Sequence, residues 1–255
     1  MKILSYNVNG IRAAERKGLS EWLKTASPEV VLIQETKAQP EQIDESVYTD
    51  LGYECHWHSA EKKGYSGVGI LSKIKPDHLE VGCGIEYIDR EGRILRADFG
   101  ELSIMSVYVP SGSSGDLRQD LKMQFLADFQ AYIRELLKER PKLVIGGDFN
   151  ICHTEIDIHN PKSNKDTSGF LPEERAWVTE FLEEGLIDSF RHFYPDALDR
   201  YSWWSYRANA RANNKGWRID YNMASSALTD QLEDAAIWPD AKHSDHCPVS
   251  LDLKF

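Results

Sequence analysis

Polar residues that can bind a metal ion or move a proton stand where apolar runs of the sequence end. Glu35 follows the run Val30–Gln34, and Asp148 and Asn150 follow the run 143–147. Similar positions, at or beside the end of an apolar run, are held by Asn7, Tyr108, Asp220, Asp245 and His246. A single acid at a strand end is usually a turn or helix-capping residue. Several polar residues at the ends of apolar runs in one chain indicate instead a site where strand ends converge.

The donor atoms of these residues define the chemistry that such a site supports. Hard oxygen ligands, which suit Mg²⁺ or Mn²⁺ better than Zn²⁺, come from Asn7, Glu35, Asp148, Asn150 and Asp245. His246 has no further His or Cys at zinc-ligand spacing near it. The sequence contains neither a Gly-x-Ser-x-Gly elbow nor a Gly-x-x-x-x-Gly-Lys loop. Serine nucleophiles and nucleoside-triphosphate binding are therefore excluded, and metal-assisted hydrolysis remains.

The segment 200–219 indicates the substrate. It contains no acidic residue, although the whole chain has 30 Lys and Arg against 41 Asp and Glu and a net charge of −11. Its cations are Arg200, Arg207, Arg211, Lys215 and Arg218, and its aromatic residues are Tyr201, Trp203, Trp204, Tyr206 and Trp217. Cations bind phosphates and flat rings stack on sugars or bases, so the segment favours a nucleic-acid groove. The alternative is a solvated basic face over a core tryptophan, because neighbouring residues of a strand point to opposite faces.

The elements that must position these residues alternate along the chain. Runs rich in β-branched and apolar residues predict strands over 2–8, 30–34, 67–72, 102–109, 142–146, 219–224 and 249–254. Helical spacing of apolar residues predicts helices over 19–26 and 117–137, and a third helix opens at Pro172 and stops near Gly185. Strands interleaved with helices predict one α/β domain over residues 1–255, with sheets inside and helices outside.

Composition limits the class of protein. With 41% hydrophobic residues the chain can bury a sizeable core, and its negative charge excludes a protein that coats polyanions through overall charge. No run approaches the roughly 20 apolar residues of a membrane span, and the N-terminus turns polar too soon for a secretory signal. Four cysteines without a Cys-x-x-Cys pair predict reduced thiols in a cytoplasmic protein.

Motifs at these positions resemble the exonuclease III family of apurinic/apyrimidinic endonucleases, within the wider endonuclease/exonuclease/phosphatase superfamily. They are 5–12 (SYNVNGIR), 34–37 (QETK), 64–69 (GYSGVG), 108–110 (YVP), 147–150 (GDFN), 168–175 (SGFLPEER), 217–221 (WRIDY) and 244–246 (SDH), in family order. The resemblance implies a four-layer α/β sandwich of the deoxyribonuclease-I type. In that fold two mixed, mainly antiparallel β-sheets pack face to face, helices lie outside, and the active site lies at one rim.

The resemblance also implies roles for single residues. Glu35, with Asn7 and Asp245, would hold a divalent metal ion, Mg²⁺ or alternatively Mn²⁺, against a phosphate oxygen. Asp148 would position and deprotonate the attacking water, and Asn150 would help to orient it. His246, held in place by Asp220, would donate a hydrogen bond to the phosphate. Tyr108 would stabilise the phosphate or the leaving oxygen. Asp148, Asn150 and His246 are further candidate metal ligands.

Substrate-binding residues follow from the same resemblance. A flipped-out abasic sugar would enter a pocket whose walls match Trp203, Trp217 and Ile219, and a lesion without a base loses less stacking when it flips. Asn164 falls where the family has a pocket asparagine. Further candidate DNA contacts are Arg12, Lys37, Lys62, Lys122 and Arg207. The chain departs from the family pattern at Asn9 and Ser111, where other members have Asp and Asn or Gln, and at Arg207, where some have an apolar wedge.

The expected activity is Mg²⁺-dependent hydrolysis of the phosphodiester 5′ to an abasic site in double-stranded DNA. Trimming of 3′ blocking groups and 3′–5′ exonuclease activity on double-stranded DNA would accompany it, in a balance that the departures leave open. One alternative is a superfamily phosphatase or phospholipase that acts on phosphorylated small molecules or lipids. Another is a non-catalytic DNA-binding module. A monomer is expected, with DNA and no membrane as its partner.

Overall fold

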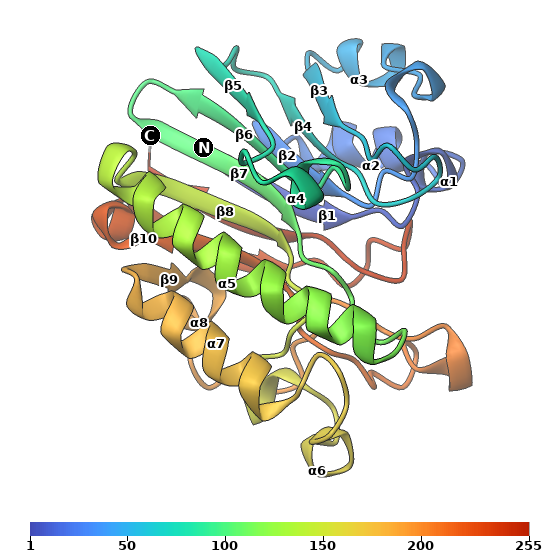
Figure 1. Ribbon diagram of the computed structural model, residues 1–255. Helices are drawn as coiled ribbons and strands as arrows, with labels where there is room; N and C mark the ends of the chain where they lie inside the picture. The colour runs from blue at the N-terminus through green and yellow to red at the C-terminus, as the bar shows by residue number, and fades with distance from the viewer. Residues whose placement is uncertain (255) are drawn as a thin grey trace.

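Two six-stranded β-sheets form the centre of the computed structural model, which describes residues 1–254 (Figure 1). The first sheet has the order β11-β12-β1-β2-β4-β3, and the second has the order β5-β6-β7-β8-β10-β9. The strands of the first sheet are β1 (Lys2–Asn7), β2 (Val30–Gln34), β3 (Glu54–His58), β4 (Val68–Ser72), β11 (Leu232–Ile237) and β12 (Val249–Leu253). Those of the second are β5 (His78–Val81), β6 (Ile94–Phe99), β7 (Leu102–Tyr108), β8 (Lys142–Asp148), β9 (Leu186–Asp188) and β10 (Asp220–Ser225).

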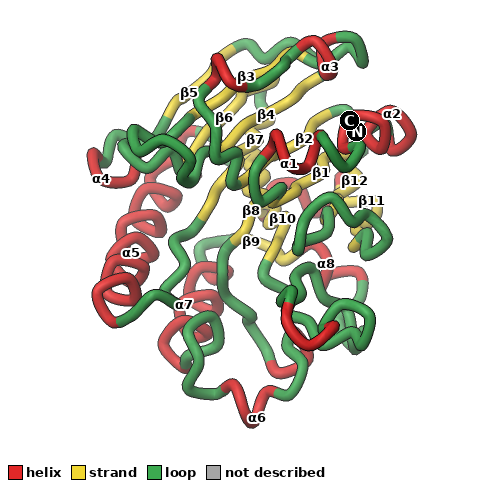
Figure 2. The backbone as a smooth tube through the Cα atoms, turned by 90° about the vertical axis from the view of Figure 1, so that its right-hand side faces the viewer, coloured by secondary structure: helices red, strands yellow, loops and turns green. Residues whose placement is uncertain are grey.

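Helices cover the outer faces of the two sheets. They are α1 (Ile11–Glu15), α2 (Leu19–Ala26), α3 (Ser46–Thr49), α4 (Glu86–Asp89), α5 (Asp116–Glu139), α6 (Pro161–Asn164), α7 (Pro172–Glu183) and α8 (Ser189–Phe193). Figure 2 shows the strands in the middle, with α5 and α7 on one side and α2 on the other. A membrane-spanning helix, which needs about 20 apolar residues, is absent from the described part of the chain.

Alternating side chains of the central strands build the layers. In β2, Val30 and Leu32 enter the core between the sheets, whereas Val31 and Ile33 pack with the residues of α1 and α2. In β8, Val144 faces that same inner core and its neighbours pack under α5 and α7. A strand that is buried on both faces has a continuous apolar sequence, as these segments do. The structure confirms the expected four-layer α/β sandwich with two mixed, mainly antiparallel sheets.

Two parallel strand pairs direct the polar residues to one rim. β1 runs parallel to β2 and β7 runs parallel to β8, so in each pair the carboxyl ends lie together. The registers align Asn7 with Gln34 and Tyr108 with Asp148. β10 is antiparallel to β8 and starts where β8 ends, with Asp220 opposite Asp148. Residues far apart in sequence therefore meet at a single edge of the sandwich.

Most predicted elements are confirmed, and the differences lie mainly at the sheet edges. Each predicted strand is present with its ends shifted by no more than a few residues, and the predicted helices correspond to α2, α5 and α7. The sequence did not predict β3, β5, β6, β9 or β11. β3, β5, β9 and β11 lie at or next to the edges of their sheets or are very short.

Close approach of β7 and β8 requires glycine at position 147. A Cβ atom added there would lie 1.9 Å from the Val107 carbonyl oxygen, which belongs to the neighbouring backbone and cannot rotate away. We expect Gly147→Ala to lower the free energy of unfolding by about 1–3 kcal/mol or more, measured by urea denaturation. Ser114→Ala, in an exposed loop, is the control and should change it by less than about 0.5 kcal/mol. Equal stability of the two variants would show that the strands can separate at this point.

Candidate active site

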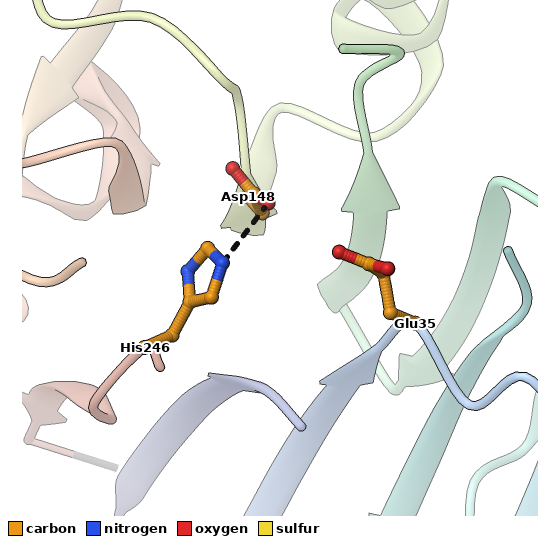
Figure 3. Close-up of side chains that lie close together, drawn as sticks. All are labelled: Glu35, Asp148 and His246. Carbon is orange, nitrogen blue, oxygen red and sulfur yellow. Dashed lines mark ion pairs between the residues drawn. The ribbon is translucent and has the colours of Figure 1, made fainter. Parts of the chain in front are cut away.

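An acidic cluster lies at the rim where the parallel strand pairs end. The ligand atoms of Glu35, Asp148 and His246 lie within 4.8 Å of one another, and the three side chains come from separate segments (Figure 3). The Asn7 amide joins two of them, because its Nδ2 donates to Glu35 Oε1 at 2.9 Å and to Asp148 Oδ2 at 2.8 Å. A single amide group therefore fixes both carboxylates.

The Asn7 amide is itself oriented by the backbone. Its Oδ1 accepts the Asn9 backbone N–H at 3.0 Å, which turns the nitrogen toward the carboxylates. In this arrangement the Asn7 side-chain nitrogen faces the two acids as a hydrogen-bond donor. Its oxygen, the atom that was expected to bind the metal ion, accepts the Asn9 N–H instead. Burial raises the pKa of Glu35, but the Lys37 ammonium, 2.8 Å away, outweighs burial and holds that pKa below its usual value. Glu35 is therefore an anion at neutral pH.

His246 lies between two aspartates. Its Nδ1 is 2.9 Å from Asp220 Oδ2. Its Nε2 is 3.8 Å from Asp148 Oδ2, and this ion pair is drawn as the dashed line in Figure 3. Burial lowers the pKa of His246, but the Asp220 and Asp148 carboxylates outweigh burial and raise that pKa to about 10. The imidazole is therefore protonated at neutral pH, with Nδ1–H donated to Asp220 and Nε2–H facing Asp148.

Asp148 is buried and held from several sides. Burial raises its pKa to about 7; the His246 charge opposes this, and the Asp220 and Glu35 charges add to it. The backbone N–H of Asn150 donates to Asp148 Oδ1 at 2.8 Å. The Asn150 side-chain nitrogen donates to the Val109 carbonyl at 2.9 Å and to Asp148 Oδ2 at 3.3 Å. A carboxylate whose pKa lies near neutrality is suited to accept a proton from water.

Tyr108 adds a neutral hydroxyl donor. Its ring is buried, and burial together with the Glu35 charge raises its pKa well above 10, so the phenol keeps its proton. The Arg93 guanidinium carbon lies 4.8 Å from the ring centroid. Arg93 also donates to the Tyr108 carbonyl at 2.9 Å, so it fixes both the ring and the backbone. No pattern in the sequence predicts a role for Arg93, which contacts both the ring and the carbonyl of Tyr108.

The cluster opens into a pocket of about 330 Å³. Glu35, Tyr108, Asp148, Asn150 and His246 line it, and its other lining residues are Ser111, Ser113, Thr167, Ser168, Gly169, Trp203, Trp217, Ile219 and Asp245. The indoles of Trp203 and Trp217 meet edge to face, with ring centroids 5.9 Å apart and planes at 88°. The backbones of the two tryptophans also pair, with N–O distances of 2.9 Å in both directions. The pocket thus joins ionisable groups to a rigid aromatic wall.

Comparison with known proteins identifies the family. The profile of the endonuclease/exonuclease/phosphatase family matches residues 4–246. The chain belongs to this family. It is 45% identical over 252 residues to an exodeoxyribonuclease of Bacillus subtilis strain 168, covering 98% of each protein. It is 42% identical to the DNA repair nuclease APEX1 of Danio rerio, covering 99% of this chain and 82% of that protein. The structure of an AP endonuclease from Archaeoglobus fulgidus superposes with a TM-score of 0.91 at 28% identity over all of both chains.

Not every expected substrate residue of this family member lies in the pocket. Asn164 is in α6, where its amide donates to the carbonyls of His159 and Asn160 at 3.2 and 3.0 Å. Arg12 lines a separate cavity with Glu15 and Tyr48. Arg207 is exposed in a short 3₁₀ turn. These three residues are outside the lining of the acidic pocket, whereas Trp203, Trp217 and Ile219 are part of it.

Several predicted cationic contacts are structural instead. Arg218 is buried, and its guanidinium pairs with Asp157 and Asp188, each at 2.7 Å. Arg211 stacks on Trp204 at 4.6 Å and donates to backbone carbonyls of the loop before His246. Lys122 is fully buried against Glu174. Lys122 and Arg218 therefore do not face phosphates, because each is buried and neutralised inside the fold; Arg211 is partly buried, and its contact with phosphate stays a prediction. Trp204 is buried and Trp203 lines the pocket, as the alternation along a strand predicts.

Proposed function

We propose that this chain is a DNA repair nuclease that hydrolyses the phosphodiester 5′ to an abasic site in double-stranded DNA and leaves a 3′-hydroxyl. It would also remove 3′ blocking groups and nucleotides from 3′ ends. One observation carries the proposal: the buried Asp148–His246 pair lies beside Glu35 and opens into a pocket with an indole wall. The names of the relatives, an exodeoxyribonuclease and a DNA repair nuclease, support a DNA substrate. A cytoplasmic monomer is proposed, and its four free cysteines suit a reducing compartment.

The donor set fits a divalent ion of the Mg²⁺ or Mn²⁺ type. Glu35 and Asp148 are carboxylates held close together by one amide, and like charges at short range repel unless a cation neutralises them. Oxygen donors of this kind favour Mg²⁺. A bound ion would neutralise charge on the scissile phosphate. His246 is assigned to the phosphate, because Asp220 orients the ring from Nδ1 and leaves Nε2 as the donor that borders the pocket.

The proposed proton transfers follow from which side chains lie next to one another in the site. Asp148 would take the proton of the attacking water, which the Asn150 side chain helps to orient. His246 would donate from Nε2 to a phosphate oxygen as negative charge develops there, while Asp220 keeps the ring in place. The Tyr108 hydroxyl would donate to the phosphate or to the leaving oxygen. Phosphodiester hydrolysis needs mainly positioning and charge neutralisation, and these fixed donors supply both.

The lining of the pocket favours an abasic sugar over a small phosphorylated molecule. None of its described lining residues is Lys or Arg, although a multiply phosphorylated ligand would require such cations. The wall formed by Trp203, Trp217 and Ile219 is apolar and suits the flat face of a sugar. A nucleotide without a base also loses less stacking when it leaves the duplex. These features support the nuclease over the phosphatase or phospholipase alternative.

The proposed function is tested with a duplex that carries one tetrahydrofuran abasic analogue. We expect a single cut 5′ to the analogue in Mg²⁺, no cut in chelator, and recovery when Mg²⁺ is returned. The same duplex with an intact nucleotide at that position is the control and should stay uncut internally. An uncut abasic duplex in Mg²⁺ would contradict the proposal. Hydrolysis of soluble phosphomonoesters or sphingomyelin instead would support the alternative, and binding without cleavage would indicate a non-catalytic module.

A further inference from the structure

Both carboxylate oxygens of Asp245 are held by donors of this chain. Oδ1 accepts the Asn9 side-chain amide at 2.9 Å and the Ser244 hydroxyl at 3.2 Å. Oδ2 accepts the indole Nε1–H of Trp203 at 3.0 Å. Asn9 is fixed in turn, because the Lys37 ammonium donates to its side-chain oxygen. The carboxylate is thus part of a continuous hydrogen-bond chain that ends at the pocket wall.

The bond to Asp245 fixes a ring that the backbone alone does not fix. Trp203 pairs with Trp217 through main-chain bonds in both directions, which hold its Cα but leave the side-chain torsions free. The terminal torsion of tryptophan is broad, so an indole needs a contact of its own to keep one orientation. Asp245 supplies a charged acceptor for it, and Trp217 supplies the edge-to-face contact.

The position of Asp245 also separates it from the acidic cluster. Among the described residues, the acids and histidine with mutually close ligand atoms are Glu35, Asp148 and His246, and Asp245 is not one of them. Its backbone carbonyl accepts the Trp204 N–H at 3.1 Å, so the segment as well as the side chain is attached to the tryptophan pair.

We propose that Asp245 is a positioning residue for Trp203, not a metal ligand, and that this bond sets the preference of the pocket for a sugar without a base. The inference rests on the proposed function. An indole held in one orientation keeps the pocket too narrow for an intact nucleotide. An indole that can turn admits a base, and the difference between the two substrates falls.

Paired variants test the bond itself. Trp203→Phe keeps an aromatic ring and removes the N–H donor, and Asp245→Leu keeps the approximate shape of the side chain and removes both acceptor oxygens. For each variant kcat/KM is measured for abasic incision and for removal of an intact 3′ nucleotide. We expect the ratio of the two values to fall by about tenfold in each single variant. The double variant should be no lower than either single variant, because both remove the same contact.

Asp240→Asn serves as the matched control. Asp240 is exposed in the preceding loop, and its substitution should leave the ratio within about twofold of the native value. Additive effects of Trp203→Phe and Asp245→Leu, or an unchanged ratio in Trp203→Phe, would overturn the inference.

Binding of Mn²⁺ without DNA, followed by electron paramagnetic resonance, separates the two roles of Asp245. Glu35→Gln removes the charge of a proposed ligand, whereas Asp245→Asn on this inference removes only a nearby charge. We therefore expect Glu35→Gln to weaken Mn²⁺ binding at least about tenfold more than Asp245→Asn. Equal losses would make Asp245 a ligand and overturn the inference. A native protein that leaves the abasic duplex uncut would refute the proposed function instead, and the Mn²⁺ comparison would still report on Asp245.

Discussion

Replacement of His246 by alanine is expected to lower kcat/KM for incision of the abasic duplex by about 10²–10⁴-fold. The imidazolium is the one cationic side chain among the described lining residues, so its loss removes that positive charge from the pocket that would receive the phosphate. The ring borders the pocket and lies outside the main hydrophobic clusters, so we expect the variant to fold. Single-turnover rates at saturating Mg²⁺ measure the effect on the chemical step.

Asp220→Asn is the companion variant, because it keeps the shape beside Nδ1 and removes the charge. The Asp220 carboxylate stabilises the imidazolium and so raises the pKa of His246. Without that charge the His246 proton is lost at lower pH, and the alkaline limb of the pH–rate profile should move to lower pH. The double variant should be no slower than His246→Ala alone, since both residues act as a unit. A loss below tenfold in His246→Ala would mean that another group donates to the phosphate.

The inner strands of the fold could be predicted from sequence, whereas most of the unpredicted strands lie at or near the sheet edges. β2 is buried on both faces, so nearly every residue is apolar and the run is evident. β3 (ECHWH) is an edge strand with half-exposed side chains, and it carries no period that marks a strand. β6 is buried, but its Arg96 and Asp98 give it a polar sequence. Those two charges neutralise each other at 3.0 Å, which only the structure reveals.

The candidate site also has residues that could be predicted from the sequence and residues that could not. Residues at strand ends were predictable as a group, because parallel pairing brings carboxyl ends to one rim whatever the loops between them do. The roles of the cations were not. Arg218 pairs with Asp157 across 61 residues of sequence, and Lys122 pairs with Glu174 across 52. Nothing local distinguishes a cation with such a distant partner from one that faces solvent or phosphate.

Replacement of Lys122 by methionine is expected to lower the free energy of unfolding by about 3–5 kcal/mol, measured by urea denaturation. Lys122 is fully buried, and its ammonium donates to Glu174 Oε1 and to the Asn150 carbonyl at 2.8 Å. Burial lowers the pKa of Lys122, and the Glu174 charge counteracts burial, so the pair is stable only while both partners are present. Methionine fills the same volume but leaves the Glu174 carboxylate buried without a counter-charge. The bond to Asn150 is also lost, and incision by the folded variant should slow.

Lys138→Met is the matched control on the same helix, α5. Its side chain is 64% exposed and pairs only with Glu135, so the change in stability should stay within about 0.5 kcal/mol. A second variant separates the charge from the shape: Lys122→Met combined with Glu174→Gln removes the buried anion and keeps acceptors for the Gly169 and Leu171 N–H groups. That double variant should regain part of the lost stability, because a neutral buried pair costs less than a single buried charge. If Lys122→Met and Lys138→Met unfold at the same urea concentration, water must reach Glu174 and solvate it, and the pair does not anchor α5 to the loop that carries Asn150.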